Sequence, residues 1–306
     1  MTTVRLYATP LGRGQLALIG ALIVLAAVGW AVTGDRMAGM DHGPGTDPGA
    51  LGFFLTAWVV MMGAMMFPSI APMVIAYERI RVRRRELGKS SPAAGTVLFV
   101  AGYLVAWTTV GLLGFAIYET AASVAGDELA WDNAGRWLAG GLILAAAVWE
   151  LTPAKDVCLR KCRTPFDFLF GGWRDGGLGA LRLGVEHGAW CIGCCWGLML
   201  ALFALGVMSV GWMAFIAALI AAEKLIPGPR RVLRVGVAAL LVALGLSVAL
   251  VPERVPGLTI PGSHAAHHGG MNMGGHGGAT MKEHQGGAAR EEHHGGATMM
   301  EPHGGE

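Results

Sequence analysis

Charged residues are scarce in this chain: they make up only 14% of its 306 residues, whereas soluble proteins average about 25%. A large water-soluble core is therefore disfavoured, because too few polar side chains remain to cover its surface. Hydrophobic residues reach 54% and fall into runs that approach the roughly 20 residues needed to cross a bilayer. The composition predicts an all-α, polytopic transmembrane helical bundle with the lipid bilayer as its surroundings.

Cysteine is also rare, and its placement argues against a secreted disulfide framework. All five cysteines lie between Cys158 and Cys195, and none falls in a loop that we expect outside the cytoplasm.

Basic residues cluster at the ends of apolar runs, where membrane topology explains them, so nucleic acid is not an expected partner. The sequence contains no nucleotide-binding signature, so any transport would depend on gradients or exchange.

The apolar runs define about seven segments, of which the fourth and the sixth are short. They are Gly14–Val32, Gly52–Ala76, Ala93–Tyr118, Trp137–Leu151, Gly188–Met208, Gly211–Ile226 and Val232–Val251. Lysine and arginine accumulate after the second, fourth and sixth segments, which places the N-terminus in the cytoplasm and the C-terminus outside a bacterial inner membrane. We therefore expect a multi-pass transmembrane domain over residues 1–251 and a disordered tail over residues 252–306.

The fifth segment carries three cysteines within five residues of an apolar run. Residues three and four apart share one face of a helix, so His187, Cys191, Cys194, Cys195 and Met199 form one stripe. Thiolates and thioethers are soft ligands that select Cu(I). Buried cysteine in a membrane helix is commonly inert packing, but this density favours a metal site.

The second segment contributes two adjacent rows of methionine, which are candidate thioether ligands. Met61 and Met65 form one row and Met62 and Met66 the other, each pair four residues apart. Methionine is a common core filler. However, Pro68 follows the rows directly and favours a bend in the helix. A proline leaves a backbone carbonyl group without its helical hydrogen bond, and at membrane depth such a group must face protein or a polar cavity. We expect these rows to lie near the depth of the cysteine stripe.

Three further groups lie in the segments that we expect in the cytoplasm or at its boundary. Cys158 and Cys162 are expected in the loop after the fourth segment, where they would pass on a soft metal or a disulfide, or remain idle thiols. Glu150 is expected as a boundary charge, with a ligand or a proton carrier as the alternative. Glu223 and Lys224 are expected as an interfacial pair.

The tail and the first outer loop hold most of the remaining candidate metal ligands. Met37, Met40 and His42 form a short cluster in the loop. The candidates in the tail are His264, His267, His268, Met271, Met273, His276, His284, His293, His294 and His303. This segment has no apolar periodicity and cannot fold alone. Imidazole and thioether suit copper, while imidazole alone also suits zinc and nickel, so the tail is interpreted as a low-affinity metal collector.

A family resemblance rests on four stretches between about Gly52 and Pro227. They are Met61-Met-Gly-Ala-Met-Met-Phe-Pro68, Cys191-Ile-Gly-Cys-Cys-Trp-Gly-Leu-Met199, Gly206-Val-Met-Ser-Val-Gly-Trp-Met213 and Glu223-Lys224-Leu225. With these stretches the sequence resembles a bacterial family of predicted metal-binding integral membrane proteins, long catalogued as a domain of unknown function. The resemblance implies a helical membrane protein that binds metal through these motifs, and it implies no established reaction.

Two functions of different classes follow from these patterns. The leading hypothesis is the handling of a soft metal, Cu(I), by transport or delivery through an intramembrane Met/Cys site, with a metallochaperone or cuproprotein as a possible partner. The alternative is a membrane thiol–disulfide oxidoreductase that uses Cys191 and Cys194. A metal sensor or scaffold is a third interpretation. Enzymatic activity is not the favoured expectation, and zinc and nickel remain the alternative metals.

Overall fold

The computed structural model describes residues 12–37, 49–89, 91–125, 134–206, 209–226, 230–256 and 258. These residues belong to one compact unit, which spans Met1–Asn272. The predicted ligands Met40 and His42, and every predicted ligand of the tail from His264 onward, lie outside the described residues, as does the side chain of Met37.

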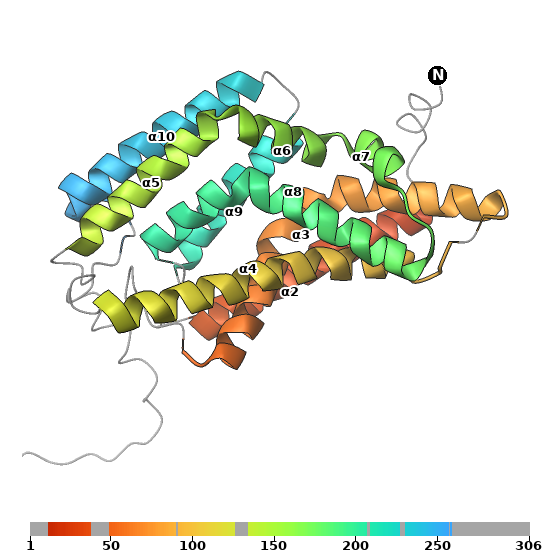
Figure 1. The fold of residues 1–306 in the computed structure, drawn as a ribbon, viewed down its shortest axis with the longest axis horizontal. Helices are drawn as coiled ribbons and strands as arrows, with labels where there is room; N and C mark the ends of the chain where they lie inside the picture. Colours follow the sequence, from red (N-terminus) through yellow and green to blue (C-terminus); the bar gives the residue numbers. More distant parts are fainter. Residues whose placement is uncertain are drawn as a thin grey trace, which may run out of the picture. The chain divides into compact units, whose positions relative to one another are not determined.

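The described residues form α-helices and one short 3-10 turn, and they contain no strand (Figure 1). The longer helices are α2 (Arg13–Met37), α3 (Leu51–Glu86), α4 (Gly95–Ala125), α5 (Arg136–Leu151), α8 (Gly176–Leu205), α9 (Val210–Leu225) and α10 (Arg230–Leu250). The shorter elements are α6 (Pro153–Arg163), α7 (Pro165–Gly172) and η3 (Pro252–Arg254). Each of the seven predicted apolar segments is helical, which confirms the all-α fold class.

Five helices, α2, α3, α4, α8 and α10, are long and apolar enough to cross a membrane. A sixth span results if α5 and α6, which are bent by 69° at a short break, are counted together. The residues at the break account for it. Thr152 accepts a hydrogen bond from the Lys155 backbone N–H at 3.3 Å, and Pro153 occupies the first turn of α6. The predicted short segments correspond to α5 and α9, which have 16 residues each.

Helix α8 begins at Gly176, well before the predicted start at Gly188. Its start is anchored to α3, because Asp175 accepts hydrogen bonds from Trp173 Nε1 at 3.0 Å and from Arg84. These two hydrogen bonds lower the pKa of Asp175. At about 1.5 Å of rise per residue, Cys191 lies about 22 Å from the start of α8. The cysteines therefore lie near the middle of this helix.

Helices α4 and α8 approach each other through glycine. A Cβ atom added to Gly102 would lie 2.0 Å from the carbonyl oxygen of Leu181, and one added to Gly184 would lie 2.0 Å from that of Phe99. Small residues at helix interfaces allow this backbone approach in membrane proteins. The approach brings Tyr103 of α4 to 3.1 Å from Cys191 of α8, measured between the hydroxyl and Sγ.

Replacing Gly102 with alanine is expected to destabilise the fold by more than the roughly 1–3 kcal/mol typical of overpacked cores, because the new methyl group meets backbone. The matched control is Gly114→Ala on the same helix, where an added Cβ meets nothing within 4 Å. The control should be neutral or stabilising by up to about 1 kcal/mol, since alanine favours helix. Thermal unfolding of both purified variants checks this, and equal midpoints would contradict the packing described.

Candidate metal centre

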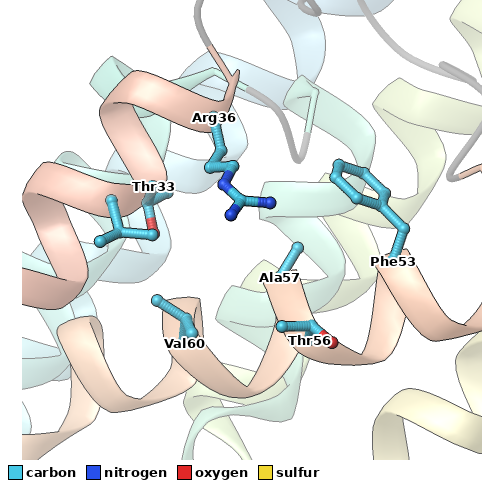
Figure 2. A pocket seen from close by; sticks show the side chains of 7 residues that line it. Thr33, Arg36, Phe53, Thr56, Ala57 and Val60 are labelled. Atoms are coloured by element: carbon cyan, nitrogen blue, oxygen red, sulfur yellow. The ribbon is translucent and has the colours of Figure 1, made fainter.

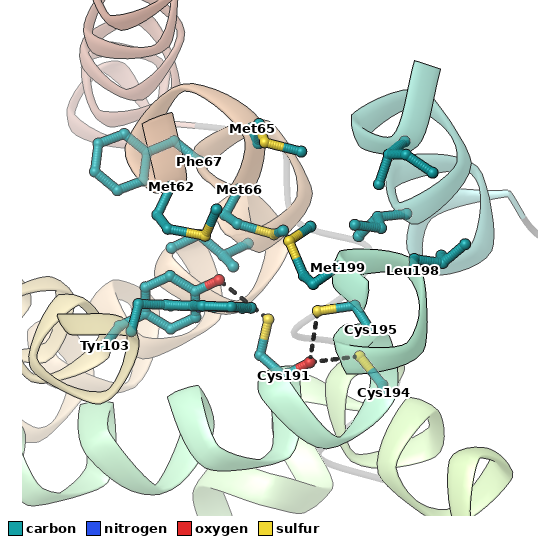
Figure 3. Packing of buried hydrophobic residues seen from close by; sticks show 14 of the residues in the cluster. Met62, Met65, Met66, Phe67, Tyr103, Cys191, Cys194, Cys195, Leu198 and Met199 are labelled. Carbon is teal, nitrogen blue, oxygen red and sulfur yellow. Dashed lines mark hydrogen bonds between the residues drawn. The ribbon is translucent and has the colours of Figure 1, made fainter. Parts of the chain in front are cut away.

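Three thiols of α8 converge on one buried position. The Sγ atoms of Cys191, Cys194 and Cys195 all lie within 4.8 Å of one another, and each residue is at most 1% exposed. The helical spacing produces this convergence, because positions i, i+3 and i+4 share a face. Cys194 and Cys195 donate hydrogen bonds from Sγ to the carbonyl oxygen of Cys191 at 3.1 and 2.9 Å (Figure 3). The thiols are free and oriented together, as the ligands of a soft metal must be.

One cysteine of the second pair, Cys162, contacts the same cluster, whereas Cys158 lies beside Gly193. Cys162 Sγ lies 3.7 Å from Cys194 Sγ, and a Cβ added to Gly193 would lie 2.8 Å from Cys158 Sγ. The prediction that Cys158 and Cys162 lie in a loop is wrong, because Thr152 and Pro153 start helix α6, whose buried Leu159 packs against the core. The structure therefore brings Cys162 to the thiols of α8 and leaves Cys158 outside the group that converges.

A buried lysine contacts this cluster, which the sequence did not predict. Lys224 Nζ lies 2.9 Å from Cys191 Sγ and 3.5 Å from the Ser69 hydroxyl. Lys224 and Glu223 are 8% and 2% exposed, so the predicted interfacial pair is wrong. Helix α9 packs against α3 and α8, and its last turn directs both charged side chains into the bundle. A buried ammonium needs a negative partner, and a Cys191 thiolate supplies one.

The methionine rows of α3 are buried beside the same cluster. Met61, Met62, Met65 and Met66 are at most 2% exposed, and they share one hydrophobic core with Met199 and the cysteines of α8. Figure 3 shows the side chains of Met62 and Met66 turned toward Met199 and the cysteines. Pro68 lies inside α3, and Figure 1 shows this helix changing direction along its length. The structure thus brings the two predicted clusters of sulfur together.

His187 lies in an aromatic environment one turn below the thiols. Its ring centroid is 5.5 Å from that of Phe168, 5.8 Å from that of Tyr103 and 5.9 Å from that of Phe99. The group of thiols within 4.8 Å of one another does not include it. Its Nδ1 atom has no hydrogen-bond partner in the described part of the chain. The structure therefore buries His187 next to the cluster but not within it.

A second set of buried charges lies where α5, α6 and α9 meet. Lys155 donates hydrogen bonds to both Glu150 and Glu223, and all three side chains are at most 3% exposed. Glu150 is therefore buried and paired, which overturns its interpretation as a boundary charge. No pattern in the sequence predicted this pairing, because Glu150, Lys155 and Glu223 lie on three different helices, α5, α6 and α9.

A pocket between α2 and α3 lies apart from these charges and thiols. It is lined by Val32, Thr33, Arg36, Phe53, Thr56, Ala57 and Val60 (Figure 2). None of these residues carries sulfur, imidazole or a carboxylate, so this pocket is not a metal site.

Comparison with known proteins identifies the chain. Residues 55–248 match the model of a family described as PpoB2, a copper chaperone. Searches of curated proteins and of solved structures gave no significant match. The matched residues make up more than half of the chain and include the thiol cluster, both buried charge groups and the methionine rows. The family agrees with the expected metal-binding function and specifies copper as the metal that its members handle. The chain belongs to the PpoB2 copper chaperone family.

Proposed function

We propose that this protein binds Cu(I) at the buried thiol cluster and passes it on as a membrane-embedded copper chaperone. The observation that carries the proposal is the convergence of Cys191, Cys194 and Cys195, with Cys162 3.7 Å from Cys194. Thiolate is the soft ligand that selects Cu(I), and membership of a copper chaperone family points to the same metal.

The charge of Lys224 fits this proposal. Cu(I) held by two thiolates is a complex of net charge −1, and the ammonium 2.9 Å from Cys191 Sγ neutralises it. Neutrality matters because an uncompensated charge is costly in a buried site. A divalent ion held by three thiolates would be balanced as well, so charge alone does not choose the metal. The neighbouring thioethers favour Cu(I), because thioether is a soft ligand of Cu(I), whereas zinc sites are built from thiolate, imidazole and carboxylate.

The path of the metal is proposed from the order of its ligands. The tail, residues 252–306, and the loop residues Met40 and His42 would collect copper outside the membrane. Met61, Met62, Met65 and Met66 would then guide it through the transmembrane domain, residues 1–251, as neutral ligands. The thiols would hold it most strongly, before delivery to a metallochaperone or cuproprotein or release across the inner membrane.

The burial of the thiols weighs against the alternative of a thiol–disulfide oxidoreductase. Such an enzyme must present a sulfur to a partner, whereas Cys191 is 0% exposed and Cys194 is 1% exposed. A metal ion is small enough to reach these atoms through a chain of side-chain ligands, but a partner disulfide is not.

Metal and thiol analysis of one variant separates the two functions. Wild-type protein and Cys191→Ser/Cys194→Ser/Cys195→Ser are loaded with Cu(I), washed with a Cu(I) chelator to strip the tail, and assayed for copper and free thiols. We expect chelator-resistant copper in the wild type and none in the variant. Wild-type protein that holds no copper, but contains a reducible disulfide between Cys191 and Cys194, would instead identify the oxidoreductase.

A further inference from the structure

The buried charges at the junction of α5, α6 and α9 are not used by the copper site. Lys155 Nζ donates to Glu150 Oε2 and, at 2.7 Å, to Glu223 Oε2. Lys155 and Glu150 are completely buried, and Glu223 is 2% exposed. Groups of this kind are expensive to bury and are retained at membrane depth mainly where they function.

The other charged groups around this junction already have partners. Arg234 of α10 donates to the carbonyl oxygens of Glu150 and Thr152 at 2.8 and 2.9 Å, and its guanidinium lies 3.3 Å from Asp156 of α6. Asp156 is also paired with the exposed Arg160 at 3.6 Å.

Lys224 of α9 is directed to Cys191 and Ser69. Within the described residues, one ammonium, that of Lys155, therefore serves two buried carboxylates. The three side chains carry an excess charge of −1 if both carboxyl groups are ionised.

The second oxygen of each carboxyl group is unpartnered. Glu150 Oε1 and Glu223 Oε1 are buried and have no hydrogen-bond partner in the described part of the chain. Both carboxyl groups contact the same Lys155 Nζ atom, which holds them close to each other. Two ionised carboxylates are acceptors only, so they cannot bond to each other. A single proton bound to one carboxyl group would make that group a hydrogen-bond donor to the other carboxylate. The same proton would cancel the excess charge of −1.

We propose that Glu150 and Glu223 form a proton-binding site, in which the two carboxyl groups share one proton and Lys155 is the fixed counter-charge. Two buried carboxylates that share one ammonium disfavour full ionisation, and paired carboxyl groups in other proteins hold one proton between them. The pair takes up and releases the proton as a unit. A metal cation is the less suitable occupant, because the Lys155 ammonium already lies between the carboxylates.

This proton site adjoins the thiol cluster. Glu223 directly precedes Lys224, which contacts Cys191. If Cu(I) enters the cluster as proposed above, the proton lost by a second thiol keeps the buried charge unchanged, so the carboxyl pair keeps its shared proton. This last step rests on the proposed function, whereas the proton site itself does not.

Infrared spectroscopy of the metal-free, full-length protein tests the proton site. A protonated carboxylic acid has a carbonyl band that shifts when H₂O is exchanged for D₂O. We expect such a band at neutral pH in the wild type and its complete loss in both Glu150→Gln and Glu223→Gln. In each variant the remaining carboxylate pairs one-to-one with Lys155 and has no need of a proton. Glutamine retains the size of glutamate, and circular dichroism verifies that each variant is folded.

The matched control is Glu186→Gln, at a half-exposed carboxylate 3.9 Å from Arg174, which should leave the band intact. A wild-type spectrum without the band would overturn the proposal. A band that survives in either single variant would also overturn the proposal, because the proton would then belong to one carboxylic acid and not to the pair. Metal analysis that finds a cation bound only when both glutamates are present would also overturn it. Since the protein is metal-free in the infrared assay, none of its outcomes depends on the copper function.

Discussion

Cys191→Ser is expected to weaken Cu(I) binding by more than about 100-fold, because loss of an outer-shell partner alone typically costs about 10- to 100-fold in metal affinity. Cys191 is the thiol on which the cluster is centred. Its Sγ contacts Lys224 at 2.9 Å and Tyr103 at 3.1 Å, and its carbonyl oxygen orients both Cys194 and Cys195. Serine keeps the size of the side chain but offers a harder oxygen, which Cu(I) disfavours. Titration of the purified protein in competition with a Cu(I) chelator measures the effect.

Cys158→Ser is the matched control for this substitution. It makes the same chemical change at a thiol that lies beside Gly193 and outside the group that converges within 4.8 Å. We expect a change of less than about tenfold, which is about 1.4 kcal/mol. If the two serine variants lost affinity equally, Cys191 would have no special place in the site.

Lys155→Met is expected to lower the free energy of unfolding by about 3–5 kcal/mol, the usual cost of removing one partner from a buried ion pair. Methionine fills the space of the lysine stem, so the loss comes from the charge and not from a cavity. The substitution leaves Glu150 and Glu223 side by side in the core without their only donor among the described side chains. Thermal unfolding of the metal-free protein measures the change.

Lys161→Met provides the control for Lys155→Met, because it removes the same charge from an exposed position of the same helix. It should change the free energy of unfolding by no more than about 0.5 kcal/mol. Adding Glu150→Gln and Glu223→Gln to Lys155→Met removes the unpaired charges and is expected to recover most of the lost stability. Equal unfolding midpoints for the two lysine variants would show that the buried charges do not stabilise this junction.

The helices and the sulfur ligands could be predicted because their signals are local. Apolar runs of about 20 residues indicate membrane helices, and the spacing of Cys191, Cys194 and Cys195 places their side chains on one face. The rows Met62/Met66 and Met61/Met65 follow from the same periodicity. Their approach to the cysteines was predicted from comparable depth along two helices, and Figure 3 shows Met62, Met65 and Met66 near the cysteines.

The buried charges could not be predicted because their partners come from different helices. Lys155, Glu223 and Lys224 lie next to the ends of apolar runs, where lysine and glutamate ordinarily meet water. They enter the core through the bend between α5 and α6 and through the face that the last turn of α9 turns toward the bundle. Helix α6 was missed for a related reason, since its short polar sequence around Cys158 and Cys162 has the composition of a loop. Its burial is a result of tertiary packing against α8.

X-ray absorption at the copper edge is the most direct test of the central claim that the buried thiols hold Cu(I). The full-length protein is loaded with Cu(I) and washed with a chelator, so that copper held weakly by the tail is removed. The account predicts a first shell made of sulfur alone, which disappears with the bound copper in Cys191→Ser/Cys194→Ser/Cys195→Ser. A shell dominated by nitrogen that is the same in both proteins would contradict it, because the copper would then be bound by histidine elsewhere in the chain.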